Sequence, residues 1–267
     1  MFAKLKKDDG FTLLELIIAL AIAVIATASV FNFYIRQQKS YVTQDRVTEM
    51  QQNLRVAMEI MVREIRMAGF DQTLEKTAGA GVLDADTDSI QFTMDRDMDG
   101  DCIGDTDENI TYSIFTDADG VRNLGRRDAT TGVFQSMAPY IEALGFAYGI
   151  DNNNDGLLDT DGGQIIWAID NGGTWFDLDT NEDGDINETD VIPGGENTGI
   201  VVNLDDIRAV RIWLLVHAAD GEEDYLNMKT YIVGNQKIDP IGDADATNDD
   251  ERMRILSTIV KLRNMGL

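Results

Sequence analysis

The sequence contains a single cysteine, Cys102, a single histidine, His217, and three prolines. One cysteine excludes an internal disulfide and a cysteine-rich zinc site, and one histidine leaves little room for histidine-based catalysis. Basic residues are also scarce, because 22 Lys and Arg stand against 48 Asp and Glu, for a formal net charge of −26. Nucleic-acid affinity requires clustered Lys and Arg that neutralise phosphates, so we expect no nucleic-acid partner.

Patterns that would indicate catalysis are also missing. The sequence shows neither a nucleophile paired with a base nor a glycine-rich loop suited to phosphate. His217 lies in the strand-like run IWLLVHA, where we expect it on the face or rim of a sheet. The chain is therefore predicted not to be an enzyme, and a glycosidase that uses paired carboxylates is a distant alternative.

The negative charge is confined to the back of the chain. Residues 1–68 hold 9 Lys and Arg and 7 Asp and Glu, a net +2, whereas residues 69–267 hold 13 and 41, a net −28. A domain with so much like charge repels itself unless cations bind to it. The charge distribution is thus a first indication of metal ions.

A long apolar run lies near the start of the chain. From Phe11 to Phe31 the sequence reads FTLLELIIALAIAVIATASVF, which is 21 residues with one charged side chain, Glu15. At about 1.5 Å per residue, a helix of this length reaches about 30 Å, the thickness of a bilayer core. Three lysines precede the run, and basic residues stay cytoplasmic, so we expect the N-terminus inside and the rest exported.

A cleaved signal peptide is the alternative interpretation of this run. Signal peptides have an apolar core of about 7–15 residues, followed by small residues at the cleavage site. Here the run is longer, and the residues that follow it, NFYIRQQKSY, are bulky and polar. A transmembrane helix over residues 11–33 is therefore favoured.

Glu15 is the unusual residue of this segment. A carboxylate within a membrane helix is costly, and such residues usually have a partner and a function. A cut between Gly10 and Phe11 would create an α-amino group on Phe11, with which Glu15 of a neighbouring subunit could pair. The alternative is that Glu15 reaches the membrane interface, since it lies only five residues into the run.

The residues around this cut carry a specific resemblance. They read Gly10-Phe11-Thr12-Leu13-Leu14-Glu15, which resembles the class III signal of type IV pilin-like proteins. The resemblance implies that residues 1–10 are a leader, that a prepilin peptidase cuts after Gly10 and methylates Phe11, and that Glu15 acts in filament assembly. Asp8 and Asp9 depart from the usual basic leader, although the three lysines keep its net charge positive.

The helix is expected to extend far beyond the membrane. Residues 11–68 contain no glycine and no proline, and Gly69 is placed as a C-terminal cap. We therefore predict a helix over residues 11–68, about 80–85 Å long. Its second half carries an apolar stripe that we expect to pack on the protein's own head rather than in a coiled coil. The stripe consists of Val47, Met50, Leu54, Ala57, Met61, Ile65 and Ala68.

The rest of the chain, residues 69–267, is expected to form an exported β-rich head. Short alternating runs separated by Gly, Asp and Asn clusters predict strands, and together with the helix they define an α+β fold with a mainly antiparallel β head and calcium loops. The predicted strands are Ser89–Met94, Ile110–Phe115, Ala143–Ile150, Ile165–Ile169, Ile207–His217, Met228–Val233 and Met253–Arg263.

Parts of the head resemble PilW-type minor pilins, with J-type pseudopilins of type II secretion as close cousins. The similar segments are Asn109–Phe115, Val121–Arg126, Ile141–Tyr148 and the C-terminal STIVKLRN. The resemblance implies a pilus subunit whose partners are other major and minor pilins, prepilin peptidase and the inner-membrane assembly platform. It also implies a single pass through the inner membrane, with the N-terminus in the cytoplasm and the head in the periplasm, before the protein reaches the pilus or cell surface.

A head of 199 residues is large for a repeating shaft subunit and suits a tip or priming position. Two alternatives stay open. One is a pseudopilin of type II secretion. The other is a membrane-anchored, calcium-dependent adhesive or binding module without a role in a filament.

Three acidic stretches of the head have the form D-x-[DN]-x-[DN]-G. In an EF-hand loop, oxygens at positions 1, 3, 5, 7, 9 and 12 bind calcium, and glycine at position 6 makes the sharp turn. The Asp179 loop (residues 179–190) fills every position and has Gly184 at the sixth. Its predicted ligands are Asp179, Asn181, Asp183, the carbonyl of Asp185, Asn187 and Asp190.

The other two stretches, the Asp151 loop (residues 151–162) and the Asp95 loop (residues 95–106), match the first half of the pattern. Their twelfth positions hold Gly162 and Thr106, so an acid at the eleventh position, Asp161 or Asp105, would have to substitute. The predicted ligands are Asp151, Asn153, Asp155, the carbonyl of Leu157, Asp159 and Asp161 in one loop, and Asp95, Asp97, Asp99 and Asp101 in the other. We expect one to three structural calcium ions, and the alternative for each loop is a solvated Asp-rich turn.

Overall fold

The computed structural model describes residues 11–72, 79–102, 106–170, 172–190, 200–219, 221, 225–241 and 250–265. The leader, including Gly10, lies outside these residues, as does Asp105. Contacts divide the chain into two compact units, Met1–Thr48 and Glu49–Leu267.

The first unit consists, over its described residues, of the N-terminal part of helix α1 (Leu13–Ile65). Its apolar side chains are exposed, with Leu13 at 77% and Leu20 at 64%. Within the described part of the chain, α1 is the helix that is long and apolar enough to cross a membrane. The predicted helix is thus present, although it begins at Leu13 rather than Phe11, because Thr12 caps it.

The C-terminal part of α1 belongs to the second unit and packs there by one face. The predicted stripe is confirmed from Met50 onward, whereas Val47 is only half-buried. Its buried members are Met50, Leu54, Ala57, Met61, Ile65 and Ala68. Met58 is buried as well and was not part of the predicted stripe. Met58 lies four residues after Leu54 and three before Met61, so it belongs to the same apolar face.

The helix ends at Ile65, three residues earlier than predicted, and residues 66–69 continue as turns. Gly69 has a φ of +75°, in the left-handed region that glycine adopts freely, as expected of a residue that closes a helix. A Cβ atom at this position would lie 2.7 Å from the sulfur of Met265. Gly69 thus lets the C-terminal residues pack closely against the end of α1.

The strands of the second unit form two five-stranded antiparallel sheets. The first is a meander in sequence order, with β1 (Val82–Ala85), β2 (Ile90–Thr93), β3 (Asn109–Thr116), β4 (Arg122–Asp128) and β5 (Phe134–Pro139). The second has the order β10-β9-β6-β11-β14, with β6 (Ile141–Ile150), β9 (Trp167–Asp170), β10 (Trp175–Asp177), β11 (Ile207–His217) and β14 (Met253–Lys261). This arrangement confirms the predicted α+β class.

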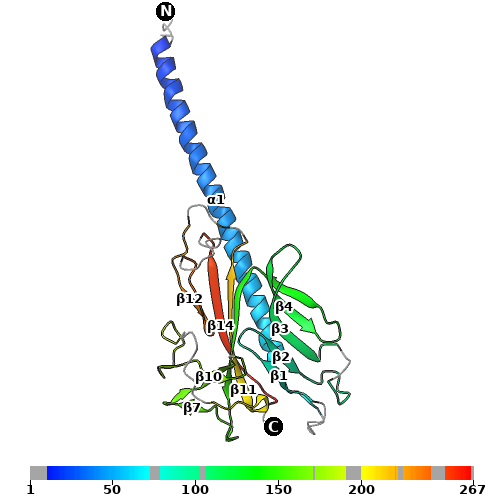
Figure 1. Ribbon diagram of the computed structural model, residues 1–267. Coiled ribbons are helices and arrows are strands. Elements are labelled where there is room, and N and C mark those ends of the chain that lie inside the picture. The colour runs from blue at the N-terminus through cyan, green and yellow to red at the C-terminus, as the bar shows by residue number, and fades with distance from the viewer. Residues whose placement is uncertain are drawn as a thin grey trace, which may run out of the picture. The chain divides into compact units, whose positions relative to one another are not determined.

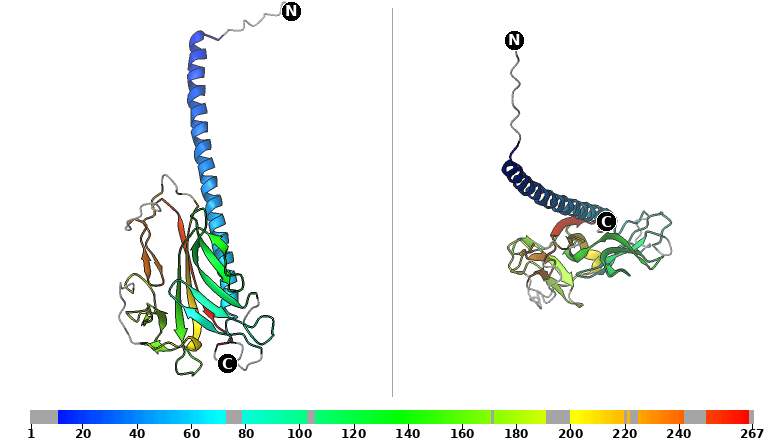
Figure 2. Two further views of the ribbon diagram at one scale, coloured as in Figure 1. Left: turned by 45° about the vertical axis from the view of Figure 1, so that its right-hand side comes forward. Right: turned by 90° about the horizontal axis from the view of Figure 1, so that it is seen from above.

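Three smaller elements complete the described part of the second unit. They are the hairpin of β7 (Thr160–Asp161) and β8 (Gln164–Ile165), the hairpin of β12 (Tyr231–Val233) and β13 (Gln236–Ile238), and a 3₁₀ turn at Leu204–Asp206. Figure 1 and the left view of Figure 2 both place the last turns of α1 alongside strands of the two sheets.

The central strands β6 and β11 are buried along almost their whole length. On one face of this pair, Trp213 of β11 packs in a cluster with Trp167 and Phe176. The side chains that alternate with this face along the strands, such as Phe146 and Ile212, are buried on the opposite face. Because both faces are covered, the sequences of these strands are continuous apolar runs and do not alternate between apolar and polar residues.

Several strand predictions need correction. The run Met228–Val233 is a strand only over Tyr231–Val233, and the side chain of Met228 is 80% exposed. The run Ile165–Ile169 is divided between β8 and β9. Strand β4 was not predicted, because its sequence, RNLGRRD, is polar. A polar strand of this kind is stable when its arginines form ion pairs with other elements, as Arg126 does with Glu64 and Asp107.

Candidate functional site: the helix start and three acidic loops

The start of α1 is organised by a reciprocal hydrogen-bond pair. The Oε2 atom of Glu15 accepts hydrogen bonds from the backbone N–H and the hydroxyl of Thr12, both at 2.9 Å. The N–H of Glu15 in turn lies 3.3 Å from the hydroxyl oxygen of Thr12. This is a capping box, in which Thr12 is the N-cap and Glu15 the third helical residue.

The capping box is also readable in the sequence as T-x-x-E before an apolar run, although it was not predicted. It gives Glu15 a partner within its own segment. The side chain of Phe11 is 90% exposed beside it. The pairing of Glu15 with a Phe11 amine on a neighbouring subunit stays a prediction.

The three acidic loops all begin where a strand of the second unit ends. Asp95 follows β2, Asp151 follows β6 directly, and Asp179 follows β10. The exposed fractions of these first aspartates are 0%, 2% and 3%, respectively. The strand ends therefore place one carboxylate of each loop in the protein interior, while the rest of the motif turns through solvent.

The loops share one backbone conformation. The residue at position 4 has a positive φ in each loop, with 70° at Met98, 56° at Asn154 and 56° at Glu182. The glycine at position 6 follows with φ values of 95°, 84° and 86°. Non-glycine residues rarely adopt positive φ, so its recurrence at one position indicates a common local fold.

The hydrogen bonds within the loops follow the same plan. The N–H of the glycine at position 6 donates to the aspartate at position 1, at 3.2, 3.1 and 2.8 Å in chain order. The N–H at position 5 donates to the side chain at position 3, at 3.1, 2.8 and 3.0 Å. The N–H at position 7 donates to position 5, at 3.0, 2.8 and 2.8 Å. The oxygen-bearing side chains are thus folded back over their own loops.

The Asp179 loop is closed by its twelfth residue. The side chain of Asp190 is 3% exposed, and its oxygens accept hydrogen bonds from the hydroxyl of Thr180 at 3.3 Å and the N–H of Asn187 at 2.9 Å. Asn187 also accepts a hydrogen bond from the N–H of Thr189 at 3.0 Å. The twelfth residue therefore contacts positions 2 and 9 of its own loop.

The Asp151 loop is closed by a different residue from the one we expected. The Oδ2 atom of Asp159 accepts a hydrogen bond from the N–H of Asn152 at 3.0 Å. Asp161, in contrast, is exposed in β7, and its carboxylate accepts from the neighbouring N–H of Gly162. The side chain of Leu157 points into solvent, as suits a residue expected to offer only its carbonyl.

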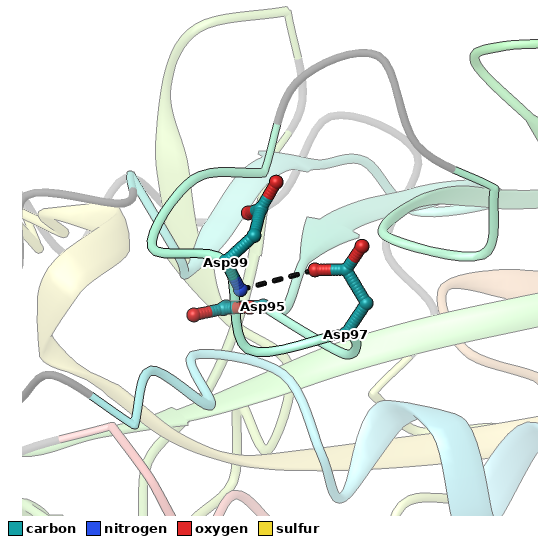
Figure 3. A group of neighbouring side chains, drawn as sticks. All are labelled: Asp95, Asp97 and Asp99. Atoms are coloured by element: carbon teal, nitrogen blue, oxygen red, sulfur yellow. Dashed lines mark hydrogen bonds between the residues drawn. The ribbon is translucent and has the colours of Figure 1, made fainter.

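The Asp95 loop has carboxylates at all of positions 1, 3 and 5, whereas the other two loops have asparagine at position 3. One oxygen from each of Asp95, Asp97 and Asp99 can be chosen so that the three lie within 4.8 Å of one another. Figure 3 shows these three side chains, with the N–H of Asp99 donating to Asp97. The chemistry of this set suits a hard cation with oxygen ligands.

Two further side chains lie next to this loop. Burial, together with the nearby carboxylates of Asp97 and Asp99, raises the pKa of Glu108, although hydrogen bonds from two backbone N–H groups oppose the shift. Burial and the surrounding carboxylates raise the pKa of the Cys102 thiol to about 12. Cys102 is therefore a buried thiol of low reactivity.

An ion-pair network centred on the buried Arg126 joins the end of α1 to the first sheet. Arg126 on β4 contacts Glu64 of α1 at 2.9 Å and Asp107 at 2.6 Å, and the hydroxyl of Tyr112 on β3 donates to Glu64. Burial opposes the charge of Arg126, but hydrogen bonds to Glu64 and Asp107 outweigh it and raise its pKa. Asp107 also pairs with Arg96, so the network reaches the Asp95 loop.

His217 lies at the end of β11 and is an ion-pair partner. Its Nδ1 atom is 2.8 Å from Glu251 and 2.9 Å from the carbonyl oxygen of Ala218. Burial alone would lower the pKa of His217, but the hydrogen bond and the charge of Glu251 raise it. The residue thus has a structural partner on the neighbouring segment, consistent with a position at the rim of the sheet.

Two family models match this sequence, one for the start of the chain and one for the head. Residues 5–31 match the prokaryotic N-terminal methylation motif, which includes the Gly10–Phe11 junction and Glu15. This motif and the apolar start of α1 fit a membrane-anchored protein of the type IV pilin class. Residues 111–264, more than half of the chain, match the family of the type IV pilus-assembly protein W. The chain belongs to this family.

A search of curated proteins found no match. Among solved structures, the chain is similar to a type IV-like pilin from Thermus thermophilus, with a TM-score of 0.35 and 15% sequence identity. That similarity covers 80% of this chain and 97% of the other.

Proposed function

We propose that this chain is a non-enzymatic minor pilin that occupies the tip or priming complex of a type IV pilus. The membership of the pilus-assembly protein W family, together with the N-terminal methylation motif, is the observation that carries the proposal. The size of the head supports a terminal position, because a bulky head is difficult to repeat along a shaft. Prepilin peptidase, the inner-membrane assembly platform and other pilins are the proposed partners.

In this proposal the exposed apolar start of α1 has two successive environments. It lies in the inner membrane before assembly and packs among the helices of neighbouring subunits in the filament afterwards. Removal of the leader exposes the amine of Phe11, and Glu15 of an adjacent subunit pairs with it. The capping box keeps Glu15 hydrogen-bonded to Thr12 until that amine is available.

The three acidic loops are proposed to hold structural calcium. The shared backbone conformation and the folded-back carboxylates of residues 95–101, 151–159 and 179–190 support this role. Calcium would neutralise part of the net −28 of residues 69–267 and order loops that otherwise repel themselves. Extracellular calcium sites of this type bind with dissociation constants of about 0.1–1 mM.

Variants at Thr12 and Glu15 test the assembly role and separate charge from capping. In a strain that lacks the gene, the wild-type chain should restore surface pili, as counted by electron microscopy. Glu15→Gln keeps a capping oxygen and loses the charge, so it should fail to restore them. Thr12→Ala loses the cap and keeps the charge, so it should restore them.

Full restoration by Glu15→Gln would contradict the pairing with a Phe11 amine. Mass spectrometry of the exported wild-type chain provides the second check, because it should begin at N-methylated Phe11. A chain that still begins at Met1 would contradict the proposed processing.

A further inference from the structure

The Asp95 loop lacks the closing acid that calcium loops of this type carry at position 12, where it has Thr106. In the other two loops a carboxylate contacts the residue at position 2. Asp190 accepts from the hydroxyl of Thr180 at 3.3 Å, and Asp159 accepts from the N–H of Asn152 at 3.0 Å. The corresponding residue of the Asp95 loop is Arg96, and its N–H also has a carboxylate partner.

That partner is Glu108, which immediately precedes β3 and lies outside the motif. Its Oε1 atom accepts hydrogen bonds from the N–H of Arg96 at 2.8 Å and of Asp97 at 3.2 Å. A backbone hydrogen bond of 2.9 Å from Met94 to the carbonyl of Glu108 fixes the residue beside the start of the loop. Glu108 therefore has the same relation to position 2 as Asp159, since each accepts from the backbone N–H of that residue, whereas Asp190 accepts from a side-chain hydroxyl.

The second oxygen of Glu108 is without a hydrogen-bond partner. The residue is 0% exposed, and its Oε2 atom is buried and makes no hydrogen bond. A buried carboxylate oxygen without a partner costs free energy, because nothing replaces the water that it has lost. The side chain of Glu108 contacts the Asp95 loop, because its other oxygen accepts hydrogen bonds from the N–H groups of Arg96 and Asp97. An unpartnered carboxylate oxygen on this side chain is suited to a cation.

We infer that Glu108 is the closing calcium ligand of the Asp95 loop, with its Oε1 atom held by the loop backbone and its Oε2 atom bound to the ion. Together with Asp95, Asp97 and Asp99 it gives the site four carboxylates. This inference rests on the proposed calcium role of the loops. The closing ligand is then Glu108, which immediately precedes β3, rather than the residue at the eleventh or twelfth position of the motif.

The position of the site gives the ion a mechanical role. The N–H of Asp95 donates to the carbonyl of Phe70 at 2.8 Å, and the N–H of Gly69 donates to the carbonyl of Thr93 at 2.9 Å. The segment that follows α1 is thus bonded to the strand that leads into the loop. A calcium ion bound by Asp95 and Glu108 therefore connects the end of α1, β2 and β3.

Hydrogen–deuterium exchange on the full-length chain in detergent micelles tests the inference loop by loop during a calcium titration. In the wild type, calcium should slow exchange over residues 94–102 and over the segment that follows α1. Glu108→Gln keeps the size and a hydrogen-bond acceptor, and it should raise the calcium concentration for half-protection of residues 94–102 by about tenfold or more. Protection of the Asp151 and Asp179 loops should stay unchanged in this variant.

Asp119→Asn is the matched control, because it removes one carboxylate from an exposed hairpin turn between β3 and β4. It should leave the titration of residues 94–102 unchanged. Thermal unfolding in EDTA provides a second readout, since Glu108→Gln relieves repulsion among clustered carboxylates and should melt at the wild-type temperature or above. A purely structural role for Glu108 predicts a lower melting temperature in EDTA.

The possible failures are distinguishable. An unchanged titration of residues 94–102 in Glu108→Gln would overturn the assignment of Glu108, and so would calcium protection confined to the other two loops. Absence of calcium protection in all three loops of the wild type would overturn the proposed calcium role as a whole.

Discussion

The two units of this chain differ in the exposure of their apolar residues along α1. The start of α1 leaves Leu13, Leu20 and Ile25 exposed, whereas the end of the same helix buries Leu54, Met61 and Ile65 within the second unit. One continuous helix thus has a first part that needs a partner from outside, a membrane or neighbouring helices, and a second part that belongs to the core of a folded head. The difference teaches that helix formation is local, while the use of each face depends on what lies beside it.

The largest expected effect comes from the network that joins the end of α1 to the first sheet. Arg126→Ala leaves Glu64 and Asp107 without their buried partner, so the free energy of unfolding should fall by about 3–5 kcal/mol. Denaturant unfolding of the full-length chain in micelles measures this change. Arg63→Ala removes an exposed ion pair with Glu59 on the same helix and should stay within about 0.5 kcal/mol of the wild type.

A pair of leucine substitutions compares the two parts of α1 directly. Leu54→Ala creates a cavity in the core and should lower the free energy of unfolding of the second unit by about 2–5 kcal/mol. Leu20→Ala changes an exposed position in the first unit and should leave that unfolding unchanged. A similar fall in the free energy of unfolding in both variants would contradict the difference in burial between the two parts of the helix.

Removal of calcium should affect the head and leave the start of α1 untouched. Each site occupied at about 10–100 times its dissociation constant contributes about 1.4–2.7 kcal/mol. Addition of EDTA should therefore lower the melting temperature of the head, and calcium, but not an equal concentration of magnesium, should restore it. An unchanged melting temperature would count against calcium in all three loops.

The smallest expected effect is the pH dependence from His217. Its pKa is raised in the folded state, so below the ordinary value of about 6.5 the pair with Glu251 contributes fully, and the contribution is lost as pH rises through the raised pKa. The difference in free energy of unfolding between the wild type and His217→Gln should therefore shrink above about pH 6.5, by roughly 1 kcal/mol or less. A difference that grows with pH would contradict the proposed pair.

Much of α1 could be predicted from residues near one another in the chain. The unbroken run without glycine or proline predicted the helix, and Gly69 marked its end. The capping box of Thr12 and Glu15 was equally local and was missed because Glu15 was considered only as a membrane charge. The helix boundaries differed by two or three residues at each end, since caps and turns occupy those positions.

The head was less predictable because its polar strands depend on distant partners. Strand β4 carries Arg126, whose position makes sense only once Glu64, 62 residues away in the sequence, lies beside it. The first halves of the acidic loops follow from local spacing, and the structure gives all three the same conformation. The closing contacts could not be predicted in the same way, since Asp159 closes its loop in place of the expected Asp161, and Glu108 lies outside the motif of the Asp95 loop.

The sequence alone determined the long helix, its apolar first part, the cleavage and methylation motif around Phe11, and the places of three oxygen-rich turns, because each depends on interactions within a few residues. Only the tertiary structure decided which face of α1 is buried, which partners neutralise Arg126 and which carboxylates close the loops. These features depend on contacts between segments far apart in the chain. A buried charge or polar atom has no water to bond to, so its free energy depends on which partner the fold places beside it.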